Sequence, residues 1–260
     1  MDPNSLERPA IVVPCYNEEE RLDAAELLRL AESVDVWLVD DGSRDRTRER
    51  IESIAAGSAG RITVFANQRN LGKAETVRRH LLEGCERNAP AVGFLDADLA
   101  TPVDEMLAMV SLLDSTTAEA ITGARVGLSG RDIRRSAARH YFGRVFSTIA
   151  SMALARRYYD TQCGAKVFRN TAALRSAIAQ PFLSRWAFDV ELLGRLIAGS
   201  PDAAPVASES LVEYPLHTWH DIAGSKLSMM AAWKTALELF VIWRDLRARR
   251  HEQARSAAVL

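Results

Sequence analysis

At residues 93–102 the chain reads Gly93-Phe94-Leu95-Asp96-Ala97-Asp98-Leu99-Ala100-Thr101-Pro102. The apolar run from Ala91 to Leu95 predicts a buried strand, and two acids one residue apart follow its carboxyl end. Both carboxylates can meet one ion if the strand ends there and the chain turns, and Thr101-Pro102 supplies that end. Mg²⁺ or Mn²⁺ takes oxygen ligands and few protein carboxylates, so the pattern suits a divalent cation that also holds a diphosphate. The other interpretation is a helix cap followed by a surface acid.

Length and composition restrict the class of protein. The chain has 260 residues, 48% of them hydrophobic and 26% charged, which is ordinary for a soluble globular protein with a sizeable core. The formal net charge of -1 argues against a general nucleic-acid binder. Three cysteines, Cys15, Cys85 and Cys163, lack ligand-like spacing and suit a reducing cytosol better than a disulfide scaffold. Because no stretch is long enough to span a membrane and no signal peptide is evident, we expect a soluble protein or one that lies on a membrane.

Strands and helices alternate before Asp96. We expect strands at 10–14, 36–39, 61–65 and 91–95, with helices at about 18–31, 47–56 and 73–86 between them. This alternation predicts right-handed crossovers and a mostly parallel sheet with helices on both faces, an α/β fold. Ligands of such sheets bind beyond the carboxyl ends of the strands.

Polar clusters follow the carboxyl ends of these four strands. They are Tyr16-Asn17-Glu18, Asp40-Asp41-Gly42-Ser43, Asn70-Leu71-Gly72-Lys73 and Asp96-Ala97-Asp98. Four polar turns on one rim of a sheet indicate a binding site. A Rossmann dinucleotide fold would carry Gly-x-Gly-x-x-Gly after the first strand, but here the turn is Pro14-Cys15-Tyr16-Asn17-Glu18, without glycine. A metal held by Asp96 and Asp98 would meet the diphosphate charge instead.

The second half of the chain departs from the alternation. We expect a helix from about 103 to 113, a strand at 120–125, a loop leading into a strand at 160–168, a helix beginning near 185, a strand at 208–212, a polar loop at 217–226 and a closing helix at 227–250. The segment from Arg131 to Arg157 combines arginines with apolar residues and almost no acids. It is either a long helix packed on the sheet with a solvated basic face, or a surface for an anionic partner or a membrane. We expect Trp186 and Trp219 in the core.

With these residues placed, the sequence resembles family 2 glycosyltransferases of the GT-A fold, from Val12 to about Trp243. In the first half the resemblance rests on Val13-Pro14-Cys15-Tyr16-Asn17-Glu18, Val39-Asp40-Asp41-Gly42-Ser43, Asn70-Leu71-Gly72-Lys73 and Asp96-Ala97-Asp98. In the second half, three segments resemble the dolichyl-phosphate β-glucosyltransferase branch, beside the dolichyl-phosphate mannosyltransferases. They are Asp160-Thr161-Gln162-Cys163-Gly164, Arg185-Trp186-Ala187-Phe188-Asp189-Val190-Glu191-Leu192 and Gly224-Ser225-Lys226-Leu227.

The resemblance implies an enzyme that transfers a hexose from a nucleotide sugar with inversion at the anomeric carbon. UDP-glucose is the favoured donor and GDP-mannose the alternative, the acceptor is a polyprenyl or dolichyl phosphate, and Mg²⁺ or Mn²⁺ is required. Asp96 and Asp98 would hold the metal. The resemblance implies a donor site made of Pro14, Tyr16, Glu18, Asp40, Asp41, Lys73, Asp96, Ala97 and Asp98.

Catalytic and acceptor roles follow from the same resemblance. Besides Asp98 at the metal, Arg125 and Lys226 would lie near the phosphates and stabilise the charge that develops there. Asp189 is the best-placed carboxylate for a general base, which an alcohol acceptor needs and an ionised phosphate hardly does; the alternative is a helix-capping or ion-paired acid. The residues that would bind the acceptor are Arg131, Arg134, Arg135, Arg139, Gln162 and Ser225.

We expect one GT-A domain over residues 1–260, with a nucleotide-sugar-binding half at 1–125 and an acceptor-binding half at 126–260. The expected location is the cytoplasm, or the cytoplasmic face of a membrane with peripheral contact. Two other functions stay open at this point. One is a glycosyltransferase that acts on a soluble acceptor, in a polysaccharide or secondary-metabolite pathway, and the other is a nucleotide-sugar-binding subunit without turnover.

Overall fold

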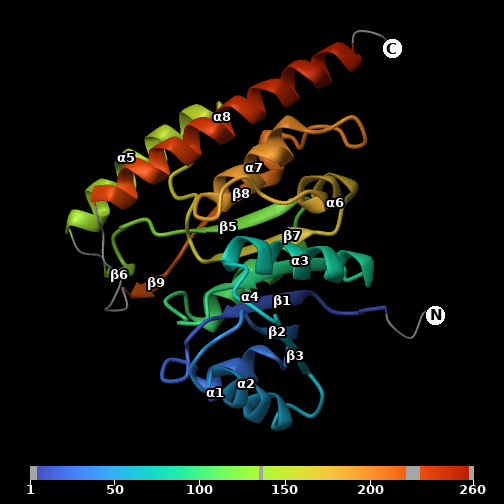
Figure 1. Ribbon diagram of the computed structural model, residues 1–260, viewed down its shortest axis with the longest axis vertical. Helices are drawn as coiled ribbons and strands as arrows, with labels where there is room; N and C mark the ends of the chain where they lie inside the picture. The colour runs from blue at the N-terminus through green and yellow to red at the C-terminus, as the bar shows by residue number, and fades with distance from the viewer. Residues whose placement is uncertain (1–4, 135–136, 221–228, 258–260) are drawn as a thin grey trace.

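A seven-stranded sheet forms the centre of the molecule in the computed structural model, which describes residues 5–134, 137–220 and 229–257 (Figure 1). Its order is β3-β2-β1-β4-β7-β5-β8. The strands are β1 (Ala10–Cys15), β2 (Asp35–Asp40), β3 (Ile62–Ala66), β4 (Ala91–Leu95), β5 (Ala120–Ala124), β7 (Ala165–Arg169) and β8 (Leu211–Pro215). All neighbours pair in parallel except β7, which is antiparallel to β4 and β5. The mostly parallel α/β sheet predicted from the sequence is confirmed.

Helices cover both faces of the sheet. Helices α1 (Ala24–Leu30), α2 (Thr47–Ala56), α3 (Lys73–Glu86), α4 (Val103–Ser115), α6 (Ala172–Ala179) and α7 (Phe188–Ala198) pack on the sheet, and α5 (Ala137–Leu154) and α8 (Met229–Ala257) lie outside this layer. Side chains of β1 alternate between two cores: Ile11 and Val13 pack with α1, α2 and α4, whereas Val12 packs with α3, α6 and α7. Because the inner strands β1 and β4 are covered on both sides, their sequences are continuous apolar runs.

A third core lies outside the sheet. Buried residues of α5 and α8, such as Leu154 and Ile242, pack on Val190 and Leu193 of α7. In Figure 1 these two helices run side by side at one end of the molecule, beyond α7. Helix α7 therefore lies between the sheet and an outer helical layer.

The first expected helix begins later than the sequence suggested. We expected it from about residue 18, but α1 starts at Ala24 because the Asp23 carboxylate caps it, accepting hydrogen bonds from the backbone N–H groups of Ala25 and Glu26. Glu18 is therefore left in the turn that follows β1, where its side chain is available to the site.

The interpretation of residues 131–157 as one long helix packed on the sheet is also wrong. Residues Asp132–Arg134 form β6, which pairs in parallel with β9 (Thr218–His220), and α5 starts only at Ala137. The helix packs on α7 and α8 rather than on the sheet. The strand depends on a partner 86 residues away (from Asp132 to Thr218), which local periodicity cannot reveal. For the same reason, residues 218–220 of the expected polar loop are a strand. Residues 221–226 of that loop lie outside the described residues.

The two tryptophans have different outcomes. Trp219 is 7% exposed, which confirms its place in the core. Trp186 is 65% exposed, so the expectation of burial was wrong. It lies in the turn before α7, where Ala187 and Phe188 occupy the buried positions.

Candidate active site

The turns after β1, β2 and β4 meet the start of α3 and enclose a pocket of about 290 Å³. Parallel strands place these turns together, since Cys15 pairs with Asp40 at the last position of β1 and β2. The pocket is lined by Pro14, Cys15, Tyr16, Glu18, Asp41, Lys73, Asp96, Ala97 and Asp98. Every residue predicted for the donor site is in this set except Asp40, and the set adds Cys15.

Two buried acids, Asp40 at the end of β2 and Asp41 directly after it, organise the surrounding loops. The Asp41 carboxylate accepts hydrogen bonds from the backbone N–H groups of Leu71 (2.9 Å) and Gly72 (2.8 Å) and from the Asn67 amide (2.9 Å). Asp40 accepts from the Ser43 N–H at 2.9 Å. Asp41 thus fixes the start of α3, whereas Asp40 shapes its own turn behind the pocket.

The turn after β1 is attached to the turn after β2. Asn17 adopts the left-handed conformation (φ 54°), which an Asn tolerates better than most residues. Its N–H donates to Ser43 Oγ, and its side-chain oxygen accepts from the Arg44 N–H. The Glu18 N–H donates to Thr47 Oγ1 at 2.7 Å. These bonds hold the Glu18 side chain at the pocket on a rigid support.

The chain turns sharply through the Asp-x-Asp motif, as predicted. Asp98 Oδ1 accepts from the Ala100 N–H at 3.1 Å, and Leu99 is in the left-handed region (φ 51°). The Asp96 N–H donates to the Gly164 carbonyl at 2.9 Å. A Cβ atom at position 164 would collide with the Asp96 carboxylate, so a larger residue there would force that side chain to move. The motif Asp160-Thr161-Gln162-Cys163-Gly164 therefore supports the acids of the pocket.

The carboxylates of the pocket repel one another. Burial raises the pKa of Glu18 to about 7, Arg21 opposes this rise, and Asp98 and Asp96 add to it. Arg21 lies 2.7 Å from Glu18. Burial also raises the pKa of Asp98, with a further contribution from Asp96. A site with this charge favours a bound cation.

The residues present fit a divalent metal that is shared with a diphosphate. Within residues 5–134, 137–220 and 229–257, no three His, Cys, Asp or Glu side chains lie close enough to hold a metal between them. Asp96 and Asp98 together supply two carboxylates, and Mg²⁺ commonly binds through one or two carboxylates plus substrate phosphates. The donor set of the pocket therefore suits Mg²⁺ or Mn²⁺ only together with a phosphate-bearing ligand.

Two lysines lie close to the ring of Phe94. The Lys73 ammonium is 2.5 Å from Asp96 Oδ1 and 5.5 Å from the centre of the Phe94 ring. Lys166 is fully buried, 5.2 Å from the same ring centre and 2.6 Å from Asp189 Oδ1. Asp189 lies in the first turn of α7, as predicted, but it is 5% exposed and paired with Lys166. This geometry fits the ion-paired alternative that the sequence left open.

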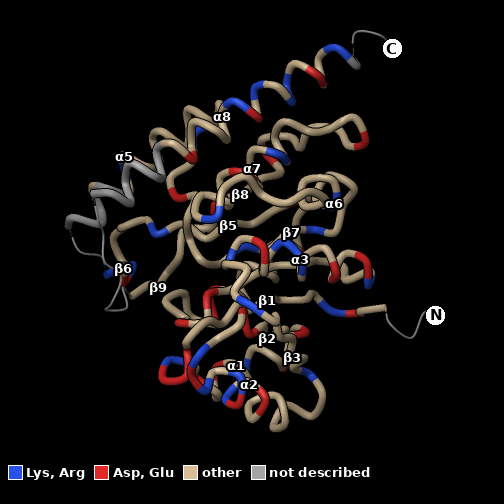
Figure 2. Tube along the Cα trace, viewed as in Figure 1, with Lys and Arg blue, Asp and Glu red and all other residues tan. Residues whose placement is uncertain are grey.

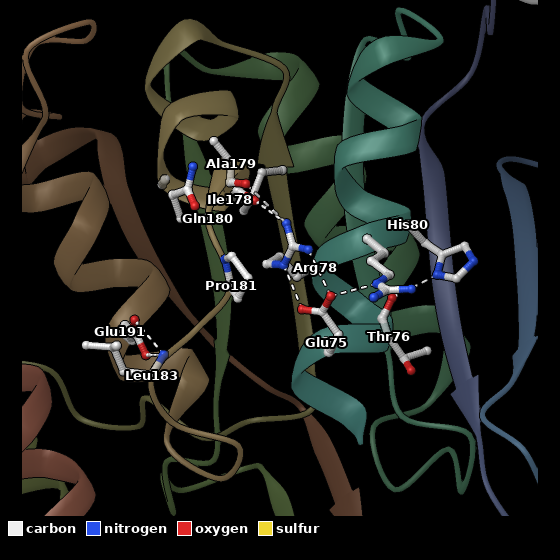
Figure 3. Close-up of polar contacts among 12 residues, drawn as sticks. Glu75, Thr76, Arg78, His80, Ile178, Ala179, Gln180, Pro181, Leu183 and Glu191 are labelled. Atoms are coloured by element: carbon white, nitrogen blue, oxygen red, sulfur yellow. Dashed lines mark hydrogen bonds and ion pairs between the residues drawn. The ribbon is translucent and has the colours of Figure 1, made fainter. Parts of the chain in front are cut away.

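Polar contacts from α3 and α7 fix the segment that precedes α7. Figure 3 shows Arg78 of α3 between Glu75 and the carbonyls of Ile178 and Ala179. The Glu191 carboxylate accepts from the Leu183 N–H at 2.9 Å. Because these groups are buried or half-buried, the N-terminus of α7 and its Asp189 are held in a fixed position relative to α3.

A second, smaller pocket of about 40 Å³ lies on the α5 side of the sheet. It is lined by Arg125, Gly143, Arg144, Phe146, Ser147, Tyr159, Asp160, Thr161 and Gln162. The Arg125 guanidinium makes a two-pronged ion pair with Asp160 (2.5 and 2.8 Å) and covers the Trp219 ring at 5.1 Å. The Arg144 guanidinium lies 4.3 Å above the Tyr159 ring. Two basic side chains thus border one small pocket.

The predicted acceptor residues are not all brought together. Gln162 lines the second pocket, whereas Arg134 is in β6, exposed and paired with Asp132 at 2.9 Å. Arg131 is half-buried just before β6. The other predicted acceptor and phosphate-binding positions lie outside the described residues or have undescribed side chains: Arg135, Arg139, Ser225 and Lys226.

Sequence reasoning missed two residues that line the second pocket and one that pairs with Asp189. Arg144 belonged to the arginine-rich segment but was not singled out, because its position depends on where α5 begins. Asp160 and Lys166 were quoted in or beside motifs without a role, yet they pair with Arg125 and Asp189. The sequence signal that could have found Asp160 and Lys166 was their place in, or just after, the motif Asp160-Thr161-Gln162-Cys163-Gly164.

Known proteins are similar to this chain over most of its length. A family model described as glycosyl transferase family 2 matches residues 10–180. The dolichyl-phosphate beta-glucosyltransferase of Drosophila melanogaster is 32% identical over 93% of this chain and 76% of its own length, and one from Trichomonas vaginalis is 31% identical over 89% and 69%. The human protein of the same name is 28% identical over 86% and 71%.

Solved structures show the same fold at lower identity. Glucosyl-3-phosphoglycerate synthase from Mycobacterium tuberculosis, in complex with Mn²⁺, UDP and glucosyl-3-phosphoglycerate, superposes with a TM-score of 0.60 at 17% identity, over 92% of this chain and 80% of that one. S. aureus TarS in complex with UDP-GlcNAc gives 0.52 at 16% identity, over 90% and 66%. The fold is thus that of GT-A glycosyltransferases. The chain belongs to glycosyl transferase family 2.

Proposed function

We propose that this glycosyltransferase moves glucose from UDP-glucose to a polyprenyl or dolichyl phosphate, with inversion at the anomeric carbon. The observation that carries the proposal is the acidic pocket around Asp96 and Asp98, in a chain whose relatives at about 30% identity are named dolichyl-phosphate beta-glucosyltransferases. GDP-mannose is the alternative donor. The proposed division of labour follows the sequence: donor binding in residues 1–125 and acceptor binding in residues 126–260.

The donor would bind at the carboxyl edge of the sheet. Asp96 and Asp98 would hold Mg²⁺ or Mn²⁺, which supplies Lewis acidity toward the departing diphosphate when bound. Tyr16 is 39% exposed beside the pocket and offers a ring face to the base of the nucleotide. Lys73 supplies a positive charge at the start of α3, where a helix N-terminus also favours phosphate.

The acceptor phosphate would bind near the second pocket. A phosphate is already ionised at pH 7, so its binding requires cations more than a general base. The Arg144 guanidinium stacks on the Tyr159 ring and donates to the Tyr159 carbonyl at 3.4 Å. None of the contacts that the structure gives it is with a carboxylate, so its positive charge is available at the pocket. The charge of Arg125 is neutralised by Asp160, so Arg125 would position the acceptor rather than attract its phosphate. Asp189, buried against Lys166, would act through the packing of α7.

Transfer assays test this proposal directly. Incubation with labelled UDP-glucose, Mn²⁺ and a polyprenyl phosphate should move label into the lipid phase, and GDP-mannose should move less. Label that enters only a water-soluble phosphorylated acceptor would favour a soluble acceptor. Binding of UDP-glucose without transfer to lipid and without hydrolysis would indicate a subunit that binds the donor but does not turn it over.

A lipid acceptor implies contact with a bilayer, and the outer helical layer supports this part of the proposal. Within the described parts of the chain, none of the helices combines the length and apolar character needed to cross a bilayer. The faces of α5 and α8 opposite their buried residues nevertheless expose large apolar side chains. These are Tyr141, Val145, Ile149 and Met152 on α5, and Leu237, Phe240 and Val241 on α8.

Basic residues accompany these apolar side chains. Figure 2 shows Lys and Arg recurring along the part of α8 that leads to the C-terminus, which contains Arg244 and Arg247. Apolar groups at an interface flanked by arginines suit an anionic lipid surface, where each basic residue contributes about 1 kcal/mol. We therefore propose peripheral contact through the outer faces of α5 and α8, on the cytoplasmic face of a membrane.

Vesicle flotation tests this contact. The double substitution Val145→Glu and Met152→Glu should release the protein from vesicles that contain anionic lipid, and should reduce transfer to lipid while leaving UDP-glucose hydrolysis unchanged. Leu128→Glu is a matched control, because Leu128 is 50% exposed outside the two helices. Flotation of the double variant equal to that of wild type would remove the membrane role of this face. The soluble-acceptor reaction would then gain support.

A further inference from the structure

The acidic pocket contains its own cation. Glu18, Asp41, Asp96 and Asp98 line it, and Lys73 is the one basic side chain among the described residues that do so. The Lys73 ammonium lies 2.5 Å from Asp96 Oδ1, so it occupies the carboxylate that a metal would need. Rings of Phe94 and Phe188 lie below it at 5.5 and 5.8 Å from their centres. An ammonium on two aromatic faces and one carboxylate is well held.

The anchor of Lys73 is rigid although its side chain is flexible. Lys73 is the first residue of α3, and the two N–H groups before it, of Leu71 and Gly72, donate to the buried Asp41 carboxylate. Gly72 adopts a φ of 88°, and the Arg185 guanidinium donates a hydrogen bond to the Leu71 carbonyl at 3.2 Å. The backbone is thus fixed from two sides. Motion of the ammonium must come from rotation of the lysine side chain.

A free divalent ion has little to bind in this state. The described residues place no three metal-binding side chains together, and one of the two acids of the motif already holds an ammonium. A metal that arrives with a nucleotide diphosphate brings phosphate oxygens, which are ligands for the ion and also a new partner for the lysine. The two cations would then exchange partners without leaving any charge uncompensated.

We propose that Lys73 is the resident counter-ion of Asp96 and is displaced onto the diphosphate when metal and nucleotide bind together. This inference rests on the proposed donor site and assigns it an order: the divalent ion does not bind before the nucleotide. Binding of metal and nucleotide is then positively coupled, and the coupling is reciprocal. In the absence of the nucleotide, the ammonium keeps Asp96 from unproductive metal binding.

Mn²⁺ binding, followed by electron paramagnetic resonance without substrate turnover, tests this order. Wild type should bind Mn²⁺ weakly alone and at least tenfold more tightly with UDP. Lys73→Met should bind Mn²⁺ alone at least tenfold more tightly than wild type, and UDP should add less. Lys73→Arg keeps a cation and should behave like wild type, whereas Asp96→Asn should bind Mn²⁺ poorly in either condition. Circular dichroism verifies that each variant is folded.

The outcomes separate this inference from the proposed donor. Equal affinity of wild type and Lys73→Met for Mn²⁺ alone would overturn the role of Lys73, whatever the nucleotide is. Gain of Mn²⁺ binding in Lys73→Met, together with no effect of UDP on wild type, would support Lys73 as the counter-ion and count against UDP as the nucleotide. GDP in place of UDP would then identify the other donor class.

Discussion

The two pockets have opposite electrostatic designs. The acidic pocket, where we propose that the donor binds, has Glu18, Asp41, Asp96 and Asp98 around one lysine. The second pocket has Arg125 and Arg144 beside a single acid, Asp160. A diphosphate would therefore enter a site whose negative charge would be balanced by a metal that comes with it. A phosphate acceptor would enter a site where the protein supplies the cations. We therefore expect donor binding, but not acceptor binding, to depend on an added ion.

The largest effect is expected from the metal carboxylates. Asp98→Ala should lower transfer by about 10³-fold, because metal assistance to a leaving diphosphate is worth several kcal/mol. The fold should persist, since Asp98 makes a single hydrogen bond to the local turn. Transfer of label to lipid, with circular dichroism as the control, measures both. Full activity of this variant, or of wild type in excess EDTA, would show that the acidic pocket does not need a metal. The two pockets would then not differ in their dependence on an added ion.

Most residues that line the acidic pocket could be predicted from the sequence, for a physical reason. Its residues stand in short motifs at strand ends, and a parallel sheet brings those ends to one edge without further information. Every predicted donor residue except Asp40 lines the pocket. Asp40 differs because its side chain turns back to the Ser43 N–H.

The second pocket depends on contacts that are distant in sequence. Arg125 is fixed by Asp160, and the break before α5 is imposed by pairing of β6 with β9. Helical periodicity over 131–157 records none of these partners, so Arg144 was not distinguished from its neighbours. Burial of Asp189 depends on Lys166 of β7, a strand that inserts antiparallel between β4 and β5.

The next largest effect concerns the buried ion pair of Asp189 and Lys166. Asp189→Asn should lower the free energy of unfolding by about 3–5 kcal/mol, because it leaves the fully buried Lys166 without its carboxylate. Urea unfolding measures this loss. Transfer by the folded fraction should fall only modestly. A loss of about 10²–10⁴-fold in transfer with unchanged stability would make Asp189 a general base and favour an alcohol acceptor.

A smaller effect is expected in the second pocket. Arg144→Ala should raise the KM for polyprenyl phosphate by about tenfold, the size expected for one charged hydrogen bond, and leave UDP-glucose hydrolysis unchanged. Thr148→Ala is a control on the same helix, because Thr148 bonds only within α5. Steady-state kinetics with varied lipid phosphate separates KM from kcat. If the donor KM changes instead, the two pockets do not divide the substrates as proposed.

The smallest effect uses pH to test the charge of the donor pocket. The pKa of Glu18 is raised to about 7 from an ordinary 4.5, mainly by burial, so the folded state holds this proton to a higher pH than the unfolded state does. Between about pH 4.5 and 7 the unfolded state therefore loses its proton first, and folding stability falls as pH rises.

The neutral variant Glu18→Gln removes this penalty. Relative to wild type, its melting temperature should rise by about 2–4 °C at pH 8 but hardly at pH 4.5, since water in the pocket limits the effect to about 1 kcal/mol. Glu52→Gln, on the exposed face of α2, should give no such pH-dependent difference. A gain that is equal at both pH values would mean that Glu18 is not strained by burial. The carboxylates of the donor pocket would then be less dependent on an incoming cation than the comparison of the two pockets implies.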